Sequence, residues 1–404
     1  MEVLRPADAR QVEELVAWAA AGETPLEVLG GGSKRALGRP VAAEHAVDLS
    51  GLTGISLYEP EELVLSAAVG TTLAEIERTL AAHAQVLAFE PPDLGPLLGA
   101  EAGSGTIGGA VACNLAGPRR IKAGAARDHF LGVEAVSGRG EAFKAGGRVI
   151  KNVTGYDMCK LLAGAYGTLA AMTRVTLKVL PAPETTRTVL LLGLDPVEAT
   201  AAMTAALGSS HEVSGAAHLP ASLAARLAEA AGAGKSLTAI RVEGIAPSVE
   251  ARTTALRQEL SDYGRSEELD DAGSRALWAR IRDAAPLADP PDRVLWRLSV
   301  APQAGHSVAA ALADGHDVEA LYDWGGGLVW LALDGGDDAG AEAVRKALER
   351  RGGHATLVRA PAEVRAAVPV FQPQPEPLAE LTRRVKEAFD PNRILNRGRM
   401  YAEV

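Results

Sequence analysis

Cysteine is nearly absent from this sequence, whose 404 residues contain only Cys113 and Cys159. Two thiols cannot form a disulfide framework, a four-thiolate iron–sulfur cluster or a zinc knuckle. The eight histidines are scattered along the chain. We therefore predict no metal site and no iron–sulfur centre in the chain itself.

Long apolar runs and an excess of positive charge are also missing. No stretch approaches the roughly 20 apolar residues that a membrane-spanning helix needs. Met1–Ala20 mixes charged with apolar residues, unlike a signal peptide. We expect a cytoplasmic protein without direct membrane insertion, in which any membrane association would have to come through a partner. The net charge of -10 disfavours binding to nucleic acid.

The length and the pattern of the chain predict more than one domain. Short apolar runs, glycine turns and amphipathic helices alternate up to Pro181–Glu184, which is typical of an α+β domain. Beyond this boundary, strands alternate with alanine-rich helices, so we expect a sheet with helices on one face. A Pro-rich linker at Phe371–Pro377 then leads to a last helix. The predicted division is residues 1–181, 182–370 and 371–404.

A first candidate site is the segment Glu27–Lys34, an apolar run followed by three glycines, Ser33 and Lys34. Glycines let successive backbone N–H groups converge on an anion, and the hydroxyl and ammonium groups add a donor and a charge. A phosphate cradle and a plain surface turn account equally well for this segment when it is considered alone.

A second glycine-rich segment, Gly103–Gly109, formally matches the dinucleotide fingerprint of a Rossmann unit. That fingerprint should follow a buried strand, whereas Pro91–Pro96 precedes it here and cannot be a central strand. We reject a Rossmann unit and predict a shaped loop over Phe89–Gly117. Two such loops in one α+β domain could bind a pyrophosphate from two sides.

The segment Lys151–Ala170 adds a recognisable motif. Together with Gly30–Gly38, Gly103–Pro118 and Phe389–Tyr401, it resembles the FAD-binding segments of vanillyl-alcohol-oxidase type flavoproteins, and among these the FAD-binding subunits of bacterial glycolate oxidases. The resemblance implies a two-subdomain, PCMH-type FAD-binding domain followed by an α/β, ferredoxin-like cap domain. It implies FAD as the cofactor.

The resemblance also implies which residues contact FAD. It implies that one side of the pyrophosphate is contacted by Gly30, Gly31, Gly32, Ser33 and Lys34. The other side would be contacted by Thr106, Ile107, Gly108, Gly109 and Asn114. Along the ribityl and adenosine part it places Gly164, Ala165, Tyr166, Gly167, Thr168 and Leu169, and near the isoalloxazine Pro91, Pro92 and Asn396.

Three departures from the family pattern bear on chemistry. Ala165 and Tyr166 replace the usual Ser and Glu, and Ser33 stands where some members attach flavin through a histidine, so we predict non-covalent FAD. The metal-binding histidine motif of relatives that oxidise 2-hydroxy acids has no counterpart, so the catalytic base is unknown. Arg293 and Arg297 could clamp a carboxylate from one face of a strand, although a solvent-facing strand accounts for them as well.

We therefore expect a FAD-binding subunit of a glycolate oxidase complex, with a small 2-hydroxy acid as substrate. The resemblance implies a catalytic flavin subunit and an iron–sulfur subunit as partners. Two alternatives stay open: a non-catalytic structural subunit of the same complex, and a stand-alone FAD-dependent hydroxy-acid dehydrogenase.

Overall fold

The computed structural model describes residues 1–149, 155–227 and 234–404. By its internal contacts the chain divides into two compact units. Unit 1 comprises Met1–Ala116, Gly124–Ala182 and Pro373–Val404, and unit 2 comprises Gly117–Ala123 and Pro183–Gln372. Unit 1 is thus assembled from three stretches of chain, the last of which is the C-terminal tail.

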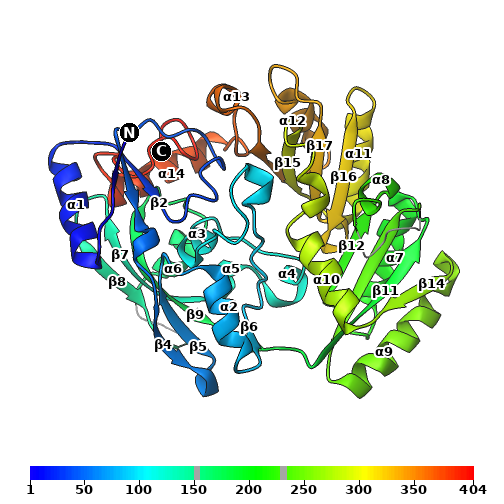
Figure 1. The fold of residues 1–404 in the computed structure, drawn as a ribbon. Coiled ribbons are helices and arrows are strands. Elements are labelled where there is room, and N and C mark those ends of the chain that lie inside the picture. Colours follow the sequence, from blue (N-terminus) through cyan, green and yellow to red (C-terminus); the bar gives the residue numbers. More distant parts are fainter. Residues whose placement is uncertain (150–154, 228–233) are drawn as a thin grey trace. The chain divides into compact units, whose positions relative to one another are not determined.

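The N-terminal part of unit 1 is a small parallel sheet with a helix beside it (Figure 1). Its strands are β1 (Glu2–Leu4), β3 (His45–Asp48) and β2 (Leu26–Leu29), in that spatial order. Helix α1 (Ala9–Ala21) begins where the Asp8 side chain accepts a hydrogen bond from the Gln11 backbone, which satisfies an otherwise unpaired helix N–H. Its buried residues recur at helical spacing, namely Val12, Val16 and Ala19.

The larger sheet of unit 1 is antiparallel and has five strands. In spatial order they are β4 (Ile55–Glu59), β5 (Val64–Ala68), β9 (Ala170–Lys178), β7 (Phe130–Ser137) and β8 (Ala142–Gly146). A two-stranded ribbon joins β6 (Gln85–Val86) to β10 (Leu180–Pro181). Along β9, buried Val175 and Leu177 alternate with half-exposed Arg174 and Thr176, so one face packs on the core and the other is polar.

Helices connect and cover these sheets. Those that bear on the site are α2 (Leu73–Ala81), α3 (Ile107–Ala112), α5 (Ala126–His129), α6 (Met158–Leu162) and α14 (Glu376–Phe389). The predicted loop over Phe89–Gly117 contains a single 3-10 turn, Pro96–Leu98, and the short helix α3. Within Lys151–Ala170, residues 151–154 lie outside the described part of the chain.

Unit 2 contains one eight-stranded antiparallel sheet, in the order β14-β11-β13-β12-β16-β17-β15-β18. Its first half has the elements β11 (Thr185–Leu192), α7 (Pro196–Gly208), β12 (Gly215–Leu219), β13 (Leu237–Gly244), α9 (Ala246–Glu259) and β14 (Ser266–Leu269). Its second half has β15 (Val294–Ser299), α11 (Gly305–Ala313), β16 (Val318–Asp323), β17 (Leu328–Leu333), α12 (Ala341–Glu349) and β18 (His354–Arg359).

Each half of unit 2 therefore repeats the order βαββαβ, with its first and third strands adjacent and central. This is the ferredoxin-like arrangement, and it occurs twice, with the two copies joined where β12 pairs with β16 at His218 and Tyr322. The predicted ferredoxin-like domain is confirmed, and its duplication is an additional finding.

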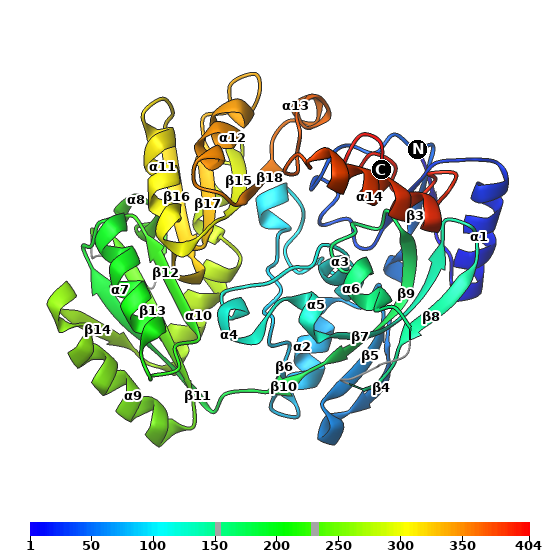
Figure 2. The same ribbon diagram turned by 180° about the vertical axis from the view of Figure 1, so that it is seen from behind.

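Helices lie on both faces of this sheet, whereas the sequence predicted them on one. Ile240 and Val242 of β13 pack with buried residues of α7 and α9. Arg241, between them, points the other way and lies 4.5 Å from the ring centroid of Trp278 on helix α10 (Asp271–Arg282). The Trp278 indole N–H also donates to Thr188 Oγ1 at 3.0 Å. α10 connects the two halves and covers the face opposite α7 and α9, as Figure 2 allows the reader to follow.

His218 of β12 makes the stability of unit 2 depend on pH. The side chain is 1% exposed, its Nδ1 lies 2.9 Å from Thr238 Oγ1, and no described residue contacts its Nε2 by a hydrogen bond. Burial lowers the pKa of His218 from 6.5 to about 4. The folded state therefore keeps the imidazole neutral at a pH where the unfolded chain protonates it.

Stability should accordingly be lost as the pH falls from 6.5 to 4, by up to about 3 kcal/mol, because each pKa unit is worth about 1.4 kcal/mol. A series of thermal unfolding curves between pH 4 and 8 checks this. The variant His218→Gln should show a shallower decline over the same interval. An unchanged pH dependence in that variant would show that another group controls acid unfolding.

Within the described residues no helix is long and apolar enough to cross a bilayer. The same part of the chain contains no group of three or more His, Cys, Asp or Glu side chains placed to hold a metal ion.

Candidate functional site

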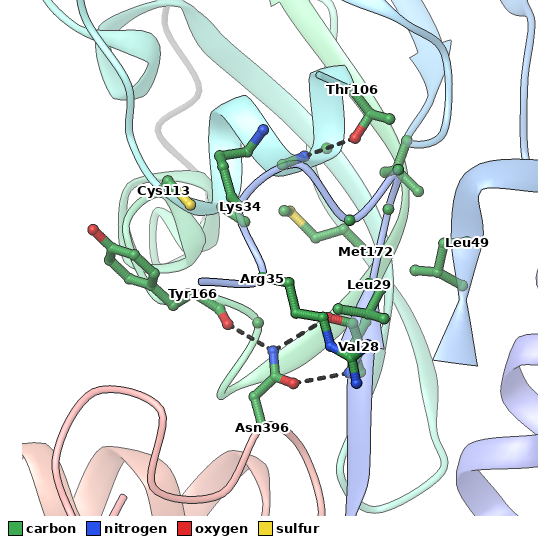
Figure 3. A pocket seen from close by; sticks show the side chains of 18 of the residues that line it. Val28, Leu29, Lys34, Arg35, Leu49, Thr106, Cys113, Tyr166, Met172 and Asn396 are labelled. Atoms are coloured by element: carbon green, nitrogen blue, oxygen red, sulfur yellow. Dashed lines mark hydrogen bonds between the residues drawn. The ribbon is translucent and has the colours of Figure 1, made fainter. Parts of the chain in front are cut away.

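A pocket in unit 1 opens between the end of β2, the start of α3, the turn before β9 and the C-terminal tail (Figure 3). Its volume is about 750 Å³ including its open mouth. Its lining residues are Val28, Leu29, Gly30, Gly31, Gly32, Ser33, Lys34, Arg35, Leu37, Leu49, Val69, Thr106, Gly108, Gly109, Ala112, Cys113, Tyr166, Gly167, Ala170, Met172, Asn396 and Arg399.

The two glycine-rich loops contact each other directly at the pocket wall. A Cβ added to Gly30 would lie 2.6 Å from Thr106 Oγ1, and one added to Gly31 would lie 2.4 Å from the Ser104 carbonyl oxygen. Neither distance is tolerated between real atoms, so any side chain would push the loops apart. Gly32 has φ +74° and open space on its Cβ side, which leaves its backbone facing the pocket.

The first turn of α3 is packed equally closely. The Thr106 hydroxyl caps α3 by accepting from the Gly109 backbone N–H at 3.3 Å. Gly108 lies against Val69, where an added Cβ would be 2.6 Å from the Val69 Cβ. Lys34 crosses over Gly109, with its Cε 2.8 Å from the position of an added Cβ. The absence of side chains at these two glycines thus lets α3 approach both β5 and the first loop.

The third wall comes from the turn before β9 and from the C-terminal tail. In Figure 3 the Asn396 side chain lies between Tyr166 and Val28. Its Oδ1 accepts from the Val28 N–H at 2.8 Å, and its Nδ2 donates to the Tyr166 carbonyl at 2.8 Å. Asn396 is 3% exposed, and both polar atoms of its side-chain amide form hydrogen bonds within the protein. It joins three segments of the pocket and is a positioning residue.

Positive charge is in excess at this pocket. Glu27 is 3% exposed and is shared by two guanidinium groups, at 2.7 Å from Arg35 Nη2 and 3.0 Å from Arg399 Nη2. One carboxylate thus faces two guanidinium groups. Lys34 adds a third cation, so about two positive charges are uncompensated among these four side chains. Asp93 lies close enough to raise the pKa of Lys34, but it does not line the pocket.

Two of these cations have unused hydrogen-bonding capacity within the described chain. Lys34 Nζ donates to Ser33 Oγ at 3.0 Å, and burial lowers the pKa of Lys34 from its usual range. Arg399 is 4% exposed, and its buried Nε has no acceptor among the described residues. Burying cationic donors without partners costs free energy. The pocket is therefore suited to an anionic ligand of about two negative charges.

The other side of the pocket is apolar or uncharged, with Val28, Leu29, Leu49 and Met172 among its lining residues. Cys113 also lines it, and burial raises the pKa of its thiol, which therefore stays protonated and adds no charge. A ligand with an anionic linker and extended apolar ring systems matches this combination.

The structure brings eleven of the residues predicted to bind a cofactor to this pocket. They are Gly30, Gly31, Gly32, Ser33, Lys34, Thr106, Gly108, Gly109, Tyr166, Gly167 and Asn396. Eight others do not line it, namely Pro91, Pro92, Ile107, Asn114, Gly164, Ala165, Thr168 and Leu169.

These eight residues are buried or hydrogen-bonded within unit 1. Ile107 is buried in the core of unit 1, and Asn114 Oδ1 accepts from the Arg127 N–H at 2.9 Å. Thr168 is 1% exposed, and its carbonyl accepts from Lys386. Pro91 and Pro92 are buried in the segment before α3. Contact of these eight residues with FAD stays a prediction.

Sequence reasoning did not select Arg35, Cys113 and Arg399 as site residues. Arg35 follows Lys34 directly, and Arg399 lies inside the C-terminal motif Phe389–Tyr401. The sequence signal that could have identified these two arginines is their place as basic residues within recognised motifs. The link between Glu27 and Arg399 spans 372 positions and has no local pattern that would reveal it.

Arg293 and Arg297, which we considered as a carboxylate clamp, do not form such a clamp in the structure. Arg293 is occupied by two acids, with Nη1 3.2 Å from Glu319 and Nη2 3.3 Å from Asp317. Arg297 stacks over Trp324, with its Cζ 5.1 Å from the ring centroid. Both belong to unit 2. The partners of Arg293 are Glu319 in β16 and Asp317 just before it, which the sequence pattern around Arg293 cannot reveal.

Comparison with known proteins identifies the family. Residues 2–146 match the family model described as an FAD binding domain. The chain is 34% identical over 404 residues to the glycolate oxidase subunit GlcE of Escherichia coli (strain K12), covering all of both chains. It is 32% identical over 180 residues to the D-lactate dehydrogenase of Archaeoglobus fulgidus, covering 44% of this chain and 38% of that one.

Solved structures share the fold at low sequence identity. The 4-ethylphenol oxidase of Gulosibacter chungangensis superimposes with a TM-score of 0.73 at 15% identity, over 99% of this chain and 89% of that one. An alkyldihydroxyacetonephosphate synthase gives a TM-score of 0.70 at 17% identity, over 98% and 75% of the two chains. The predicted α+β, PCMH-type FAD-binding fold and the prediction of FAD as cofactor are confirmed. The chain belongs to the GlcE family of FAD-binding oxidoreductase subunits.

Proposed function

We propose that this chain is the FAD-binding subunit of a glycolate oxidase complex and holds FAD in the pocket of unit 1. The observation that carries the proposal is the excess of positive charge beside two interlocked glycine loops, which suits the two negative charges of a pyrophosphate. Whole-length similarity to a glycolate oxidase subunit supports the substrate class.

In this proposal the chain's own residues have separate roles. Gly30–Lys34 offer backbone N–H groups to the pyrophosphate, and Lys34 and the Arg399 Nε supply the charge-assisted donors. Thr106, Gly108 and Gly109 form the facing wall. Asn396 holds β2 and the turn at Tyr166 in place. Bound FAD supplies hydride-accepting chemistry, which no amino-acid side chain offers. The division into residues 1–181, 182–370 and 371–404 then corresponds to a discontinuous FAD domain around an inserted cap domain.

In this proposal, partner subunits supply the catalytic base and the electron path that this chain lacks. Relatives are named as subunits of a glycolate oxidase, and oxidation of a hydroxy acid needs a base for the hydroxyl proton and a path for electrons. We propose a catalytic flavin subunit for the first and an iron–sulfur subunit for the second, since Cys113 and Cys159 cannot hold a cluster. Any association with the inner membrane would pass through these partners.

Anaerobic titration with glycolate tests the assignment. The isolated chain should be yellow, with flavin absorption that glycolate does not bleach, and the assembled complex should bleach. A colourless chain that takes up no added FAD would contradict the proposal. Bleaching of the isolated chain by glycolate would instead indicate a stand-alone dehydrogenase.

Flavin should be released when the protein is denatured. Ser33 replaces the histidine used for covalent attachment by some members of the fold, and the protonated Cys113 thiol is a poor nucleophile. Precipitation with trichloroacetic acid should leave a colourless pellet and a yellow supernatant containing intact FAD by mass spectrometry. A yellow pellet would show a covalent bond to the chain.

A further inference from the structure

A second cavity lies on the polar face of the five-stranded sheet of unit 1. Its volume is about 710 Å³ including its open mouth, and strands β5, β9, β7 and β8 supply most of its lining. Ser66 and Thr176 lie at its floor, since Ser66 is 6% exposed and its Oγ is 2.7 Å from Thr176 Oγ1. Nothing in the proposed FAD site uses these residues.

Glycine keeps this cavity open. Gly132 on β7 is paired with Thr176 on one side and Gly146 on the other. A Cβ added to Gly132 would lie 2.9 Å from the Gly147 carbonyl oxygen, so a side chain there would displace the segment that follows β8. A Cβ added to Gly147 would meet no atom within 4 Å. Small residues at these positions leave a hollow where a sheet normally carries side chains.

The lining of the cavity carries more positive than negative charge. Lys144, Arg148 and Arg174 line it together with one carboxylate, Glu134. Glu134 Oε1 lies 2.8 Å from Lys144 Nζ and 3.8 Å from Arg174 Nη1. Arg148 has no acidic partner in the part of the chain that the structure describes. The lining thus has an excess of about two positive charges.

Arg174 is an unsatisfied donor among the lining residues. Its Nε is buried, and no described residue accepts from it. The 3.8 Å separation from Glu134 is an ion pair but too long for a hydrogen bond. The hydroxyls of Ser66 and Thr176 share one hydrogen bond, so one O–H proton stays available to a ligand. Fixed donors thus face the cavity from the floor and from one side.

We propose that this cavity binds a tetrahedral oxyanion of about two negative charges, namely phosphate, either as the free ion or as the terminal group of a small phosphate ester. A guanidinium presents its N–H groups in a fork that matches the oxygens of phosphate. The hydroxyl floor supplies a further donor, and Lys144 and Arg148 compensate the charge. Glu134 limits the affinity, because its carboxylate competes with the anion for Arg174 and Lys144.

Isothermal titration of the FAD-loaded protein with inorganic phosphate tests the proposal, since bound FAD removes the first pocket from competition. Saturable binding to one site is expected. Arg174→Met should weaken it at least tenfold, and Glu134→Gln should tighten it several-fold. The exposed Arg78 of α2 offers a matched control, because Arg78→Met removes the same charge from a residue that does not line the cavity and should leave phosphate affinity unchanged.

Titration with glycerol phosphate distinguishes the two sources of the anion. Binding at least as tight as that of inorganic phosphate identifies an ester, and weaker binding identifies the free ion. No saturable phosphate binding, or equal affinity in wild type and Arg174→Met, would overturn the proposal. Glu134→Gln keeps the test decisive if Arg174→Met fails to fold, because unchanged or weaker binding in that variant contradicts the stated role of the carboxylate.

Discussion

Replacing Lys386 by Met should destabilise unit 1 by about 3–5 kcal/mol, the usual cost of leaving one member of a buried ion pair without its partner. Lys386 and Asp390 are 1% and 0% exposed, and Lys386 Nζ lies 2.8 Å from Asp390 Oδ2. The ammonium also donates to the carbonyls of Thr168 and Leu395 at 2.7 and 2.9 Å. The substitution would leave a buried carboxylate and two buried carbonyls without this donor.

The loss of stability should also affect the FAD pocket, because this ion pair connects the turn at Thr168 with the C-terminal tail. Asp390 accepts from the backbone N–H groups of Ile394 and Leu395 and so shapes the approach to Asn396. Urea unfolding and hydrogen exchange, resolved by mass spectrometry, should show reduced stability and faster exchange in the tail.

The exposed Arg384 on the same helix provides the comparison for Lys386→Met. Arg384→Met should change stability by less than about 0.5 kcal/mol, as surface substitutions usually do. The double variant Lys386→Met with Asp390→Asn should recover part of the loss, because the unpaired charge is removed. Equal stability of Lys386→Met and Arg384→Met would contradict the claim that the buried ion pair of Lys386 stabilises the tail.

Replacing Lys34 by Met should weaken FAD binding about 10- to 100-fold without destabilising the apoprotein. A hydrogen bond to a charged group is worth about 1.5–3 kcal/mol, and about 1.4 kcal/mol corresponds to a tenfold change in affinity. Burial lowers the pKa of Lys34, because it disfavours the charged form of the side chain. The melting temperature of the apoprotein should therefore stay unchanged or rise.

Two comparisons separate this effect from general damage. Lys178→Met removes a half-buried lysine of β9 that does not line the pocket, and should leave the FAD affinity unchanged. Riboflavin, which has no pyrophosphate, should bind Lys34→Met and the wild type alike. Equal loss of affinity for riboflavin and FAD would mean that Lys34 shapes the pocket and does not bind the pyrophosphate.

Local chemistry made part of the pocket predictable. Gly30–Lys34 and Thr106–Gly109 are short segments that combine glycines with hydroxyls and one ammonium, a combination typical of anion-binding loops. The structure adds the reason for Gly30, Gly31, Gly108 and Gly109, which is the close approach of Ser104, Thr106, Val69 and Lys34. Such contacts depend on tertiary packing, which is also why Ile107, within the same motif, faces the core.

Contacts between distant segments were beyond the reach of sequence patterns. Arg399 reaches Glu27 across the length of the chain, and Arg293 is neutralised by Asp317 and Glu319. The duplicated βαββαβ order of unit 2 was also missed, because the strands β12, β16 and β18 are short and lack clear polar alternation. Their pairing partners, and not their own composition, define them as strands.

The most direct test of the account is the affinity of the apoprotein for FAD compared with riboflavin, measured by fluorescence titration at low and high salt. The account predicts that FAD binds at one site, at least 100-fold more tightly than riboflavin, and that the difference shrinks as salt screens the excess positive charge of Lys34, Arg35 and Arg399. Riboflavin binding as tight as FAD binding, at both salt concentrations, would contradict it.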